Sequence, residues 1–447
     1  MKKLLFNQED FRKQKIFTFD KKINKIKLNT NKEAMMLKNL EKALACRNGS
    51  TTTIEQQYFS RIIKRKRLMD QRTLDEVASG ICSVSYLSKI ENCSVNVDET
   101  YFKALFDKLD LCYEESLNLK NDGALKRALI EFFHNAPHRI KEIADSIGPD
   151  ELFRETEKEI IMLIYNVFQK NYEDCESAIR KLDDIKNSLL DDELEALIIG
   201  TTLYLHKTCR NKEAREYIKI LLGLNSNDTL IKMVIQDLAT SIYYACGDEI
   251  SAYKSSTYVI TPNVGLAPSE KTLVNQVIKI AIESPNMEIE DINRLSTVKI
   301  NLFDANTSEE YYFYYALSLC KKEKYSLAYD ILKKSSLSSR IMALMSVIAS
   351  YTANKKVKAH VLEILALYTF GSKDEIYEGF TKYTLMKSQN SSTLELFNYL
   401  KDEVLKKFEY AYDSWLYSYV CKELQEIGYQ AGKYKETLKI CTSKFNI

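Results

Sequence analysis

The alternation of apolar and polar residues over 56–120 predicts several short helices around one small core. A basic helix is expected over about Arg61–Met69. The next helix begins at Thr73, because Thr73-Leu-Asp-Glu76 has the form of a capping box, in which a hydroxyl and a carboxylate satisfy free backbone N–H groups. Apolar residues return at helical spacing over Val97–Leu111, which predicts a further helix.

Another short helix is predicted after a tight turn at Gly80-Ile81-Cys82. Ser83 is placed to cap this helix, and its apolar positions Val84, Leu87 and Ile90 recur at helical spacing. Two helices joined by so short a turn are typical of a helix-turn-helix, which lays its second helix in the major groove of DNA. This part of the chain is therefore interpreted as a DNA-binding domain.

From residue 151 onward the pattern is helical throughout and repeats weakly. Small residues mark the second helix of each repeat, at spacings of 39, 38 and 76 residues: Cys175, Ala214, Ala252 and Ala328. Because 76 is twice 38, one degenerate copy is expected near residues 275–300, around Pro285. Helix pairs that recur with a period in the high thirties are typical of a tetratricopeptide-like α-solenoid, whose concave face suits an extended peptide or a partner helix.

The predicted fold class is all-α, an N-terminal helix-turn-helix domain followed by a tetratricopeptide-like α-solenoid. Four parts are expected: a basic extension of uncertain structure over 1–55, the helix-turn-helix domain over 56–120, a helical connector over 121–150, and the helical repeats over 151–447. The connector is expected to be broken by Pro137 and Pro149. Within the extension, Phe17, Phe19, Ile26 and Leu28 alternate as in a weak strand pair, and Asn31–Ala45 has the pattern of a short helix. Two interpretations of the extension stay open, an arm that touches DNA or a dimer partner and a partly disordered segment.

Charge is distributed unevenly along the chain. The net charge is +2, yet residues 1–72 carry 19 Lys and Arg against 7 Asp and Glu, so the remainder carries −10. The basic end coincides with the predicted DNA-binding domain, where phosphate contacts need positive charge, although a solvated basic tail explains residues 1–30 equally well. No apolar run is long enough to cross a membrane and no signal peptide is apparent, so we expect a cytoplasmic protein without membrane contact.

The sequence offers little that indicates catalysis. The phosphate-binding, dinucleotide-binding, zinc-protease and serine-hydrolase motifs are absent from the sequence. His134 and His138 are four residues apart, but no nearby Cys or acidic pair completes a metal site and Pro137 interrupts the helix. The ten cysteines form no CxxC pair and are expected to be reduced, and Trp415 is attributed to helix packing. We therefore expect a protein that is not an enzyme and that uses no cofactor or metal.

Residues 61–115 resemble the Cro/C1-type (XRE) helix-turn-helix domains. The positions that carry the resemblance are Arg67, Leu74, Glu76, Val77, Ala78, Ser85, Leu87, Ile90, Glu91 and Asn92. The run ICSVSYLSKIEN over 81–92 is similar to that of the PlcR, PrgX and Rgg type of peptide-pheromone receptors, the RRNPP group, which join this domain to a C-terminal tetratricopeptide-like domain. The likeness covers about residues 56–447 and is weaker in the repeats. The extension lies outside the family pattern.

The resemblance implies particular roles in DNA binding. Arg67 would pair with Glu91 and lock two helices together, and the opening of the second helix would face base edges or phosphates. Val84 fits either this face or the core. The family usually has glycine where Cys93 stands, so we expect Asn92 to take the left-handed conformation instead. The residues expected to contact DNA or to shape the contacting segment are Arg61, Lys64, Arg65, Lys66, Thr73, Ser83, Val84, Ser85, Tyr86, Lys89 and Asn92.

The resemblance also implies a ligand and a partner. A homodimer would bind an inverted repeat in double-stranded DNA, and a short secreted peptide, taken up again for quorum sensing, would sit in the solenoid groove. Side-chain amides and tyrosines are suited to hold an extended peptide, and the candidates are Asn166, Tyr204, Tyr243, Asn275, Tyr312 and Tyr315. Each tyrosine equally fits packing between repeats. The dimer interface is expected to include residues 385–447, and the alternative function is a protein-interaction scaffold with only accessory DNA binding.

Overall fold

The structure, a computed structural model, describes residues 53–113, 123–148, 154–224, 226, 228–261, 270–297 and 305–442. These residues form helices and connecting turns, with no β-strand among them and one isolated bridge between Arg210 and Tyr412. The predicted all-α class is confirmed for this part of the chain. The strand pair and the helix expected within 1–45 lie outside the described residues.

The chain divides into two compact units. The N-terminal unit consists of the described residues within 1–120, 150–156 and 177–194, and the C-terminal unit consists of those within 121–149, 157–176 and 195–447. This division differs from the sequence-based one, because two later segments belong with the N-terminal unit.

The N-terminal unit begins with four helices around one apolar core: α2 (Ile54–Met69), α3 (Leu74–Ala78), α4 (Val84–Glu91) and α5 (Glu99–Lys108). The first of them starts seven residues earlier than predicted, because the Thr53 hydroxyl accepts a hydrogen bond from the backbone N–H of Gln56 (3.3 Å). Phe59 lies at the centre of the core, with its ring centroid 5.3 Å from that of Phe102 and 5.6 Å from that of Phe106. Apolar burial therefore fixes α2 against α5.

Local capping sets where α3 and α4 begin. Thr73 and Glu76 form the predicted capping box, with the Thr73 backbone N–H donating to the Glu76 carboxylate (2.6 Å) and the Glu76 N–H donating to the Thr73 hydroxyl (3.2 Å). These bonds lower the pKa of the Glu76 carboxyl. The Ser83 hydroxyl accepts from the backbone N–H of Tyr86 (3.1 Å) and so caps α4.

The end of α4 differs from the expectation. Cys93 itself takes the left-handed conformation (φ +51°), whereas Asn92 stays at φ −101°. The Cys93 N–H donates to the Ile90 carbonyl (2.9 Å) and the Ser94 N–H to the Lys89 carbonyl (3.0 Å), which is the Schellman arrangement. This arrangement requires the residue after the C-cap to be left-handed, and here that residue is a cysteine.

Gln71 ends α2 in the same way, with φ +54° and an exposed side chain. Gln71→Gly is expected to raise the free energy of unfolding by about 0.5–1 kcal/mol, because relief of left-handed strain exceeds the entropy that glycine adds to the unfolded chain. Gln71→Ala keeps the Cβ and should give no gain. Hydrogen exchange of the α2 amides measures the difference, and equal protection in the two variants would contradict the strain argument.

The remaining helices are, in chain order, α6 (Ala124–Phe133), α7 (Pro137–Asp145), α8 (Glu155–Phe168), α9 (Tyr172–Ile185), α10 (Asp191–Lys207), α11 (Asn211–Leu224), α12 (Thr229–Cys246), α13 (Glu249–Ile260), α14 (Glu270–Glu283), α15 (Ile289–Asn293), α16 (Ala305–Lys321), α17 (Tyr325–Leu332), α18 (Ser339–Tyr351), α19 (Lys355–Leu367), α20 (Glu375–Ser388), α21 (Thr393–Tyr399), α22 (Ser414–Gln430) and α23 (Tyr434–Thr442). Residues of α8, α9 and α10 are divided between the two units, and the other helices belong to the C-terminal unit.

Residues 123–148 form a helix pair of the C-terminal unit rather than the expected connector. Pro137 occupies the first turn of α7, where its missing N–H costs nothing and its fixed φ suits a helix start. The proline therefore begins a helix instead of interrupting one.

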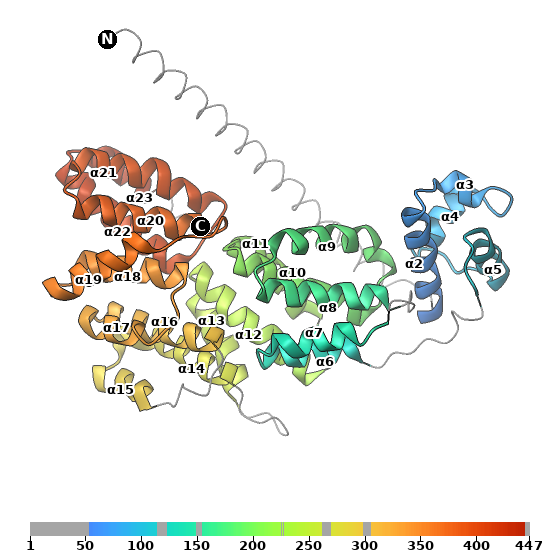
Figure 1. Ribbon diagram of the computed structural model, residues 1–447, viewed down its shortest axis with the longest axis horizontal. Helices are drawn as coiled ribbons and strands as arrows, with labels where there is room; N and C mark the ends of the chain where they lie inside the picture. The colour runs from blue at the N-terminus through green and yellow to red at the C-terminus, as the bar shows by residue number, and fades with distance from the viewer. Residues whose placement is uncertain are drawn as a thin grey trace, which may run out of the picture. The chain divides into compact units, whose positions relative to one another are not determined.

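Helices pair in succession through the C-terminal unit. The first helices of the pairs, α8, α10, α12, α14, α16, α18, α20 and α22, begin at residues 155, 191, 229, 270, 305, 339, 375 and 414, so a pair recurs every 34–41 residues. Figure 1 shows these helices in order, and from α12 onward each packs chiefly against its neighbours in the chain. The four small residues expected in the second helices are fully buried: Cys175, Ala214, Ala252 and Ala328.

Distant parts of the C-terminal unit also meet. The backbone N–H of Tyr412 donates to the Cys209 carbonyl (2.7 Å), and the Asn211 side-chain amide donates to the Tyr412 carbonyl (2.6 Å). The Ser414 hydroxyl donates to the Tyr244 carbonyl (2.8 Å), which joins α22 to α12. The turn between α10 and α11 and the end of α12 are therefore hydrogen-bonded to the start of α22 and the residues just before it.

Candidate functional site

The outward face of α4 is the candidate DNA-reading surface. Val84 is 40% exposed, and Ser85 and Lys89 are exposed beside it, so Val84 does not belong to the core. Tyr86 turns instead toward α5, where its ring stands edge-on to that of Tyr101 with centroids 5.3 Å apart. Val84, Ser85 and Lys89, three of the eleven residues expected to contact DNA or to shape the contacting segment, are thus exposed on α4.

A buried ion pair fixes α4 against α2. Arg67 donates from Nε to one Glu91 carboxylate oxygen (2.6 Å) and from Nη2 to the other (2.8 Å), in the pairing that the resemblance implied. Glu91 is 3% exposed, and its hydrogen bond raises the pKa of Arg67. Arg67 Nη1 also donates to the carbonyl of Arg72 (3.1 Å), which ties the end of α2 to the same corner. Bidentate geometry of this kind holds an orientation as well as a distance.

Two basic residues of α2 that were expected to contact DNA, Arg61 and Arg65, form ion pairs inside the protein instead. Arg61 is 1% exposed and pairs with Glu193, so it cannot contact phosphate in this arrangement. Arg65 is 12% exposed and binds Glu155 (3.1 Å) and the hydroxyl of Thr156 (2.9 Å). The acidic partners lie about 90 and 130 residues further along the chain, so local sequence patterns gave no sign of them.

The other polar residues expected to bind DNA are also partly engaged. Lys64 donates to the side-chain oxygen of Asn92 (3.2 Å), and burial lowers the pKa of this lysine. Asn92 donates in turn to the carbonyl of Ser88 (2.8 Å). Lys66 forms an i,i+4 ion pair with Asp70 (2.9 Å) and remains partly exposed.

Positive charge is scarce in the described part of the N-terminal unit. Residues 53–113 contain nine Lys and Arg and nine Asp and Glu. Residues 1–52 contain 13 Lys and Arg and five Asp and Glu, and they lie outside the described residues. The positive surplus of residues 1–113 therefore comes from residues 1–52.

The C-terminal unit contains a polar cavity of about 320 Å³. Its charged lining consists of five basic and five acidic residues: Lys170, Lys207, Lys271, Arg340, Lys373, Asp237, Glu309, Glu310, Asp374 and Asp413. The rest of the lining is apolar or neutral and includes Phe132 of α6, Phe168 of α8, Leu203 of α10 and Leu238 of α12. A cavity of this volume is at the lower end of the range for small-molecule sites.

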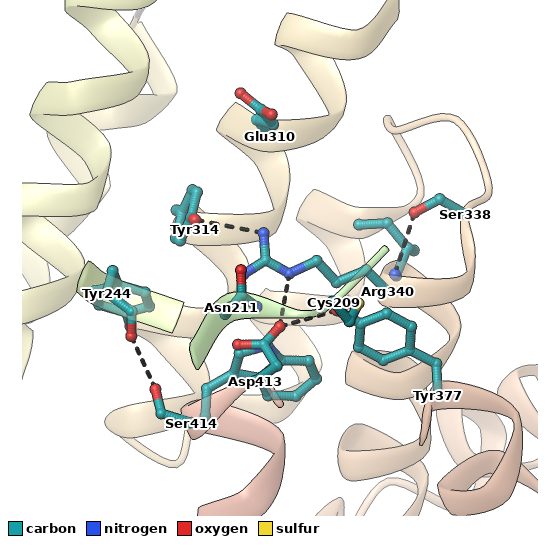
Figure 2. Close-up of polar contacts among 12 residues, drawn as sticks. Cys209, Asn211, Tyr244, Glu310, Tyr314, Ser338, Arg340, Tyr377, Asp413 and Ser414 are labelled. Atoms are coloured by element: carbon teal, nitrogen blue, oxygen red, sulfur yellow. Dashed lines mark hydrogen bonds and ion pairs between the residues drawn. The ribbon is translucent and has the colours of Figure 1, made fainter. Parts of the chain in front are cut away.

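Arg340 is the centre of one hydrogen-bonded network in the wall (Figure 2). Its Nε lies 3.2 Å from a carboxylate oxygen of Asp413, and its Nη1 donates to the hydroxyl of Tyr314 (3.3 Å). Asp413 also accepts from the hydroxyl of Tyr377 (2.9 Å) and from the indole N–H of Trp415 (2.7 Å). Burial raises the pKa of the Asp413 carboxyl, and the Arg340 charge offsets this effect in part.

A second network lines another part of the same cavity. Glu310 accepts from Lys207 (3.0 Å) and lies 3.6 Å from Lys271, which lies 3.5 Å from Asp237. Burial alone would raise the pKa of Glu310, but the charges of Lys271 and Lys207 outweigh it and lower the pKa below its usual range. Asn275 donates to Asp237 (2.7 Å) at the end of this chain of contacts.

The six side chains expected to hold a peptide do not line this cavity. Five are buried, and Tyr204 and Tyr315 use their hydroxyls on neighbouring helices, toward Glu176 (2.7 Å) and toward Asn293 (3.3 Å). The buried side chains are Tyr204, Tyr243, Asn275, Tyr312 and Tyr315, and Asn166 is half-buried on α8. The packing alternative describes the tyrosines better, and what the pattern missed is a set of charged residues brought together from distant helices.

His206 gives the C-terminal unit a pH dependence. Burial, reinforced by the charge of Lys207, lowers the pKa of His206 to about 4. The unfolded chain then binds more protons between pH 6.5 and 4, so His206 costs about 2–3 kcal/mol of stability when the pH falls from 7 to 4.5. In His206→Gln, the free energy of unfolding should therefore fall by about 2–3 kcal/mol less than in the natural chain between pH 7 and 4.5. Denaturant unfolding followed by the fluorescence of Trp415, which lies in this unit, measures the difference. The exposed His138→Gln is the control, and an equal slope in the two variants would contradict the assignment.

Neither a protein-family model, nor a curated protein, nor a solved structure matches this chain. Among the described residues, no group of three or more His, Cys, Asp and Glu side chains is arranged to hold a metal ion. His134 is the C-cap of α6 and His138 lies in the first turn of α7. Of the helices that the structure describes, none combines the length and the apolar character needed to cross a bilayer.

Proposed function

We propose that this chain is a cytoplasmic transcription regulator that binds double-stranded DNA through α3 and α4. The observation that carries the proposal is the exposed face of α4, with Val84, Ser85 and Lys89 outward. The Ser83 cap and the Arg67–Glu91 pair hold this helix at a defined angle to α2. A rigid, capped helix with a polar outward face is what base-edge recognition in a major groove requires.

The C-terminal unit is proposed to be a tetratricopeptide-like solenoid that senses an effector. Support comes from the helix pairs that recur every 34–41 residues and from the fully buried small residues at their crossings. Gly428 shows how tightly the last described pair is packed, since a Cβ there would lie 2.1 Å from the Thr437 hydroxyl oxygen. The resemblance implies a short peptide as effector, as in quorum sensing.

Continuous helices offer a route from effector to DNA. α9 and α10 carry residues of both units, and the start of α10 supplies Glu193, the partner of Arg61 on α2. An effector needs only a different affinity for two arrangements of these helices to change DNA binding. The Arg61–Glu193 pair would then link the two changes.

A homodimer fits both the DNA and the C-terminal helices. One helix-turn-helix makes few base contacts, so two copies on an inverted repeat would supply the specificity. Three large side chains are more than half exposed on the last two described helices: Tyr429 (59%), Tyr434 (57%) and Leu438 (64%). These side chains support an interface within the expected range 385–447.

One observation favours a second function, a protein-interaction scaffold. The described residues 53–113 have no net charge, and Arg61 and Arg65 are committed to internal partners, whereas DNA binding depends on free positive charge. In that case the C-terminal unit would bind a partner protein and DNA binding would be weak.

A footprint on the DNA upstream of the protein's own gene separates the two functions. The purified full chain is titrated with and without a peptide extract of the producing cells at moderate salt. A protected inverted repeat that changes with the extract is expected for the regulator. Protection no stronger than on unrelated DNA, under both conditions, would favour the scaffold.

A further inference from the structure

The cavity of the C-terminal unit has an unusual distribution of charge at its opening. Lys170 is exposed and has no ion-pair partner among the described residues. Lys207 and Lys373 also line the cavity, with side chains 38% and 42% exposed, and each already forms one ion pair, Lys207 with Glu310 (3.0 Å) and Lys373 with Glu176 (3.1 Å). Three ammonium groups therefore lie at the solvent side of the cavity, where side chains can adjust to an incoming group.

The acidic groups of the lining are mostly engaged inside the protein. Glu309 accepts from the hydroxyl of Ser338 (2.6 Å), and Asp374 accepts from the hydroxyl of Ser339 (2.6 Å) and the N–H of Gly371 (3.1 Å). A single carboxylate, that of Glu310, is shared between two lysines. Burial raises the pKa of Asp237, Glu309 and Asp413, which disfavours negative charge on all three. Burial therefore shifts the balance of the ten charged residues that line the cavity toward net positive charge.

The inner wall has hydrogen-bonding capacity that the protein does not use. Arg340 Nη2 is a buried donor without a hydrogen-bond partner in the described chain, whereas Asp413 Oδ1, which is also unpartnered, is an acceptor and does not favour an anion beside it. Arg340 is otherwise held in place by Asp413, by Tyr314 and by the ring of Phe313, whose centroid is 4.0 Å from its guanidinium carbon. A buried polar group left unpaired costs about 1–3 kcal/mol, and an anionic oxygen beside Arg340 Nη2 would remove that cost.

We propose that this cavity binds a small organic anion carrying two or more carboxylate or phosphate groups, between the lysines at the opening and Arg340 at the inner wall. The proposal names a ligand site that the DNA-binding function does not require. Lys170 and Tyr172 both line the cavity at the turn between α8 and α9, so an occupant would touch the start of a helix whose later residues belong to the N-terminal unit. The ligand would therefore be placed to act as an effector.

Calorimetric titration of the full chain with citrate and with pyrophosphate, at constant ionic strength and pH 7.5, tests the proposal. Saturable binding of one ligand per chain is expected, by citrate if the natural ligand is a carboxylate and by pyrophosphate if it is a phosphate. The double variant Lys170→Gln and Lys373→Gln should weaken binding at least about tenfold, which corresponds to about 1.4 kcal/mol. Lys333→Gln, an exposed lysine outside the lining, should leave it unchanged.

Two results would overturn the proposal. One is the absence of saturable binding by either anion, and the other is binding that the double variant leaves unchanged. Trialanine is titrated in parallel, and binding by this peptide alone would exclude the small anion while leaving a peptide effector in place. The footprint without added ligand tests DNA binding separately, so failure of the anion site would not be mistaken for failure of the regulator.

Discussion

Arg61→Met is expected to lower the free energy of unfolding of the N-terminal unit by about 3–5 kcal/mol, the cost of leaving one partner of a buried ion pair alone. Arg61 and Glu193 are 1% and 3% exposed, so water cannot replace the lost guanidinium. Without Arg61, the Glu193 carboxylate would still accept a hydrogen bond from the backbone N–H of Leu190 (2.8 Å), but it would have lost its positively charged partner. Hydrogen exchange followed by mass spectrometry over residues 54–113 measures the loss directly.

Two controls separate the ion pair from simple loss of packing. The double variant Arg61→Met and Glu193→Leu removes both charges and should recover most of the stability, because an apolar pair of similar volume is close to neutral in such positions. Lys103→Met removes an exposed partner of Glu99 and should change stability by less than about 0.5 kcal/mol. If Arg61→Met were as stable as the natural chain, the Arg61–Glu193 ion pair would not contribute to stability.

Replacing Ser85 and Lys89 together by alanine is expected to weaken DNA binding about 10- to 100-fold with little change in stability. Both side chains are exposed on α4, so the fold does not depend on them. Ser85 would lose a base-edge or phosphate hydrogen bond, and Lys89 would lose a phosphate contact, at about 1–3 kcal/mol together. The affinity should also lose about one unit of its salt dependence, because one cation is removed.

The control for this variant is Lys103→Ala, which removes an equally exposed cation from α5. It should leave the affinity for the protected sequence nearly unchanged. Equal losses in the two variants would indicate nonspecific attraction by charge. No loss in the α4 variant would place the DNA contacts, or the function, elsewhere in the molecule.

Local chemistry was sufficient to predict where α3 and α4 begin. The capping box at Thr73 and Glu76 and the Ser83 cap depend on residues within four positions of each other, and both are present in the structure. The small residues that mark the helix pairs were also visible, because a crossing of two helices admits only small side chains. The Arg67–Glu91 contact followed from the family resemblance rather than from the pattern.

The contacts that sequence reasoning missed join residues far apart in the chain. Charge alone could not show that Arg61 would be buried, because Glu193 is 132 positions away. The cavity is built in the same way, from side chains between Phe132 and Asp413 that no local period connects. Tyrosine and asparagine were reasonable peptide ligands by chemistry, yet five of the six side chains chosen are buried, and Tyr204 and Tyr315 use their hydroxyls on neighbouring helices. Cys93 shows a further limit, because the hydrogen bonds that end α4 set its left-handed backbone whichever side chain stands there.

Specific DNA binding is tested by comparing the affinity of the full chain for the footprinted sequence and for unrelated DNA. Fluorescence anisotropy gives the dissociation constants of the full chain for the footprinted sequence and for a shuffled duplex of equal composition at physiological salt. A sequence-specific regulator is expected to prefer the footprinted sequence at least about a thousandfold. Equal affinity for the two duplexes would contradict specific DNA binding and leave the C-terminal unit as the functional part of the protein.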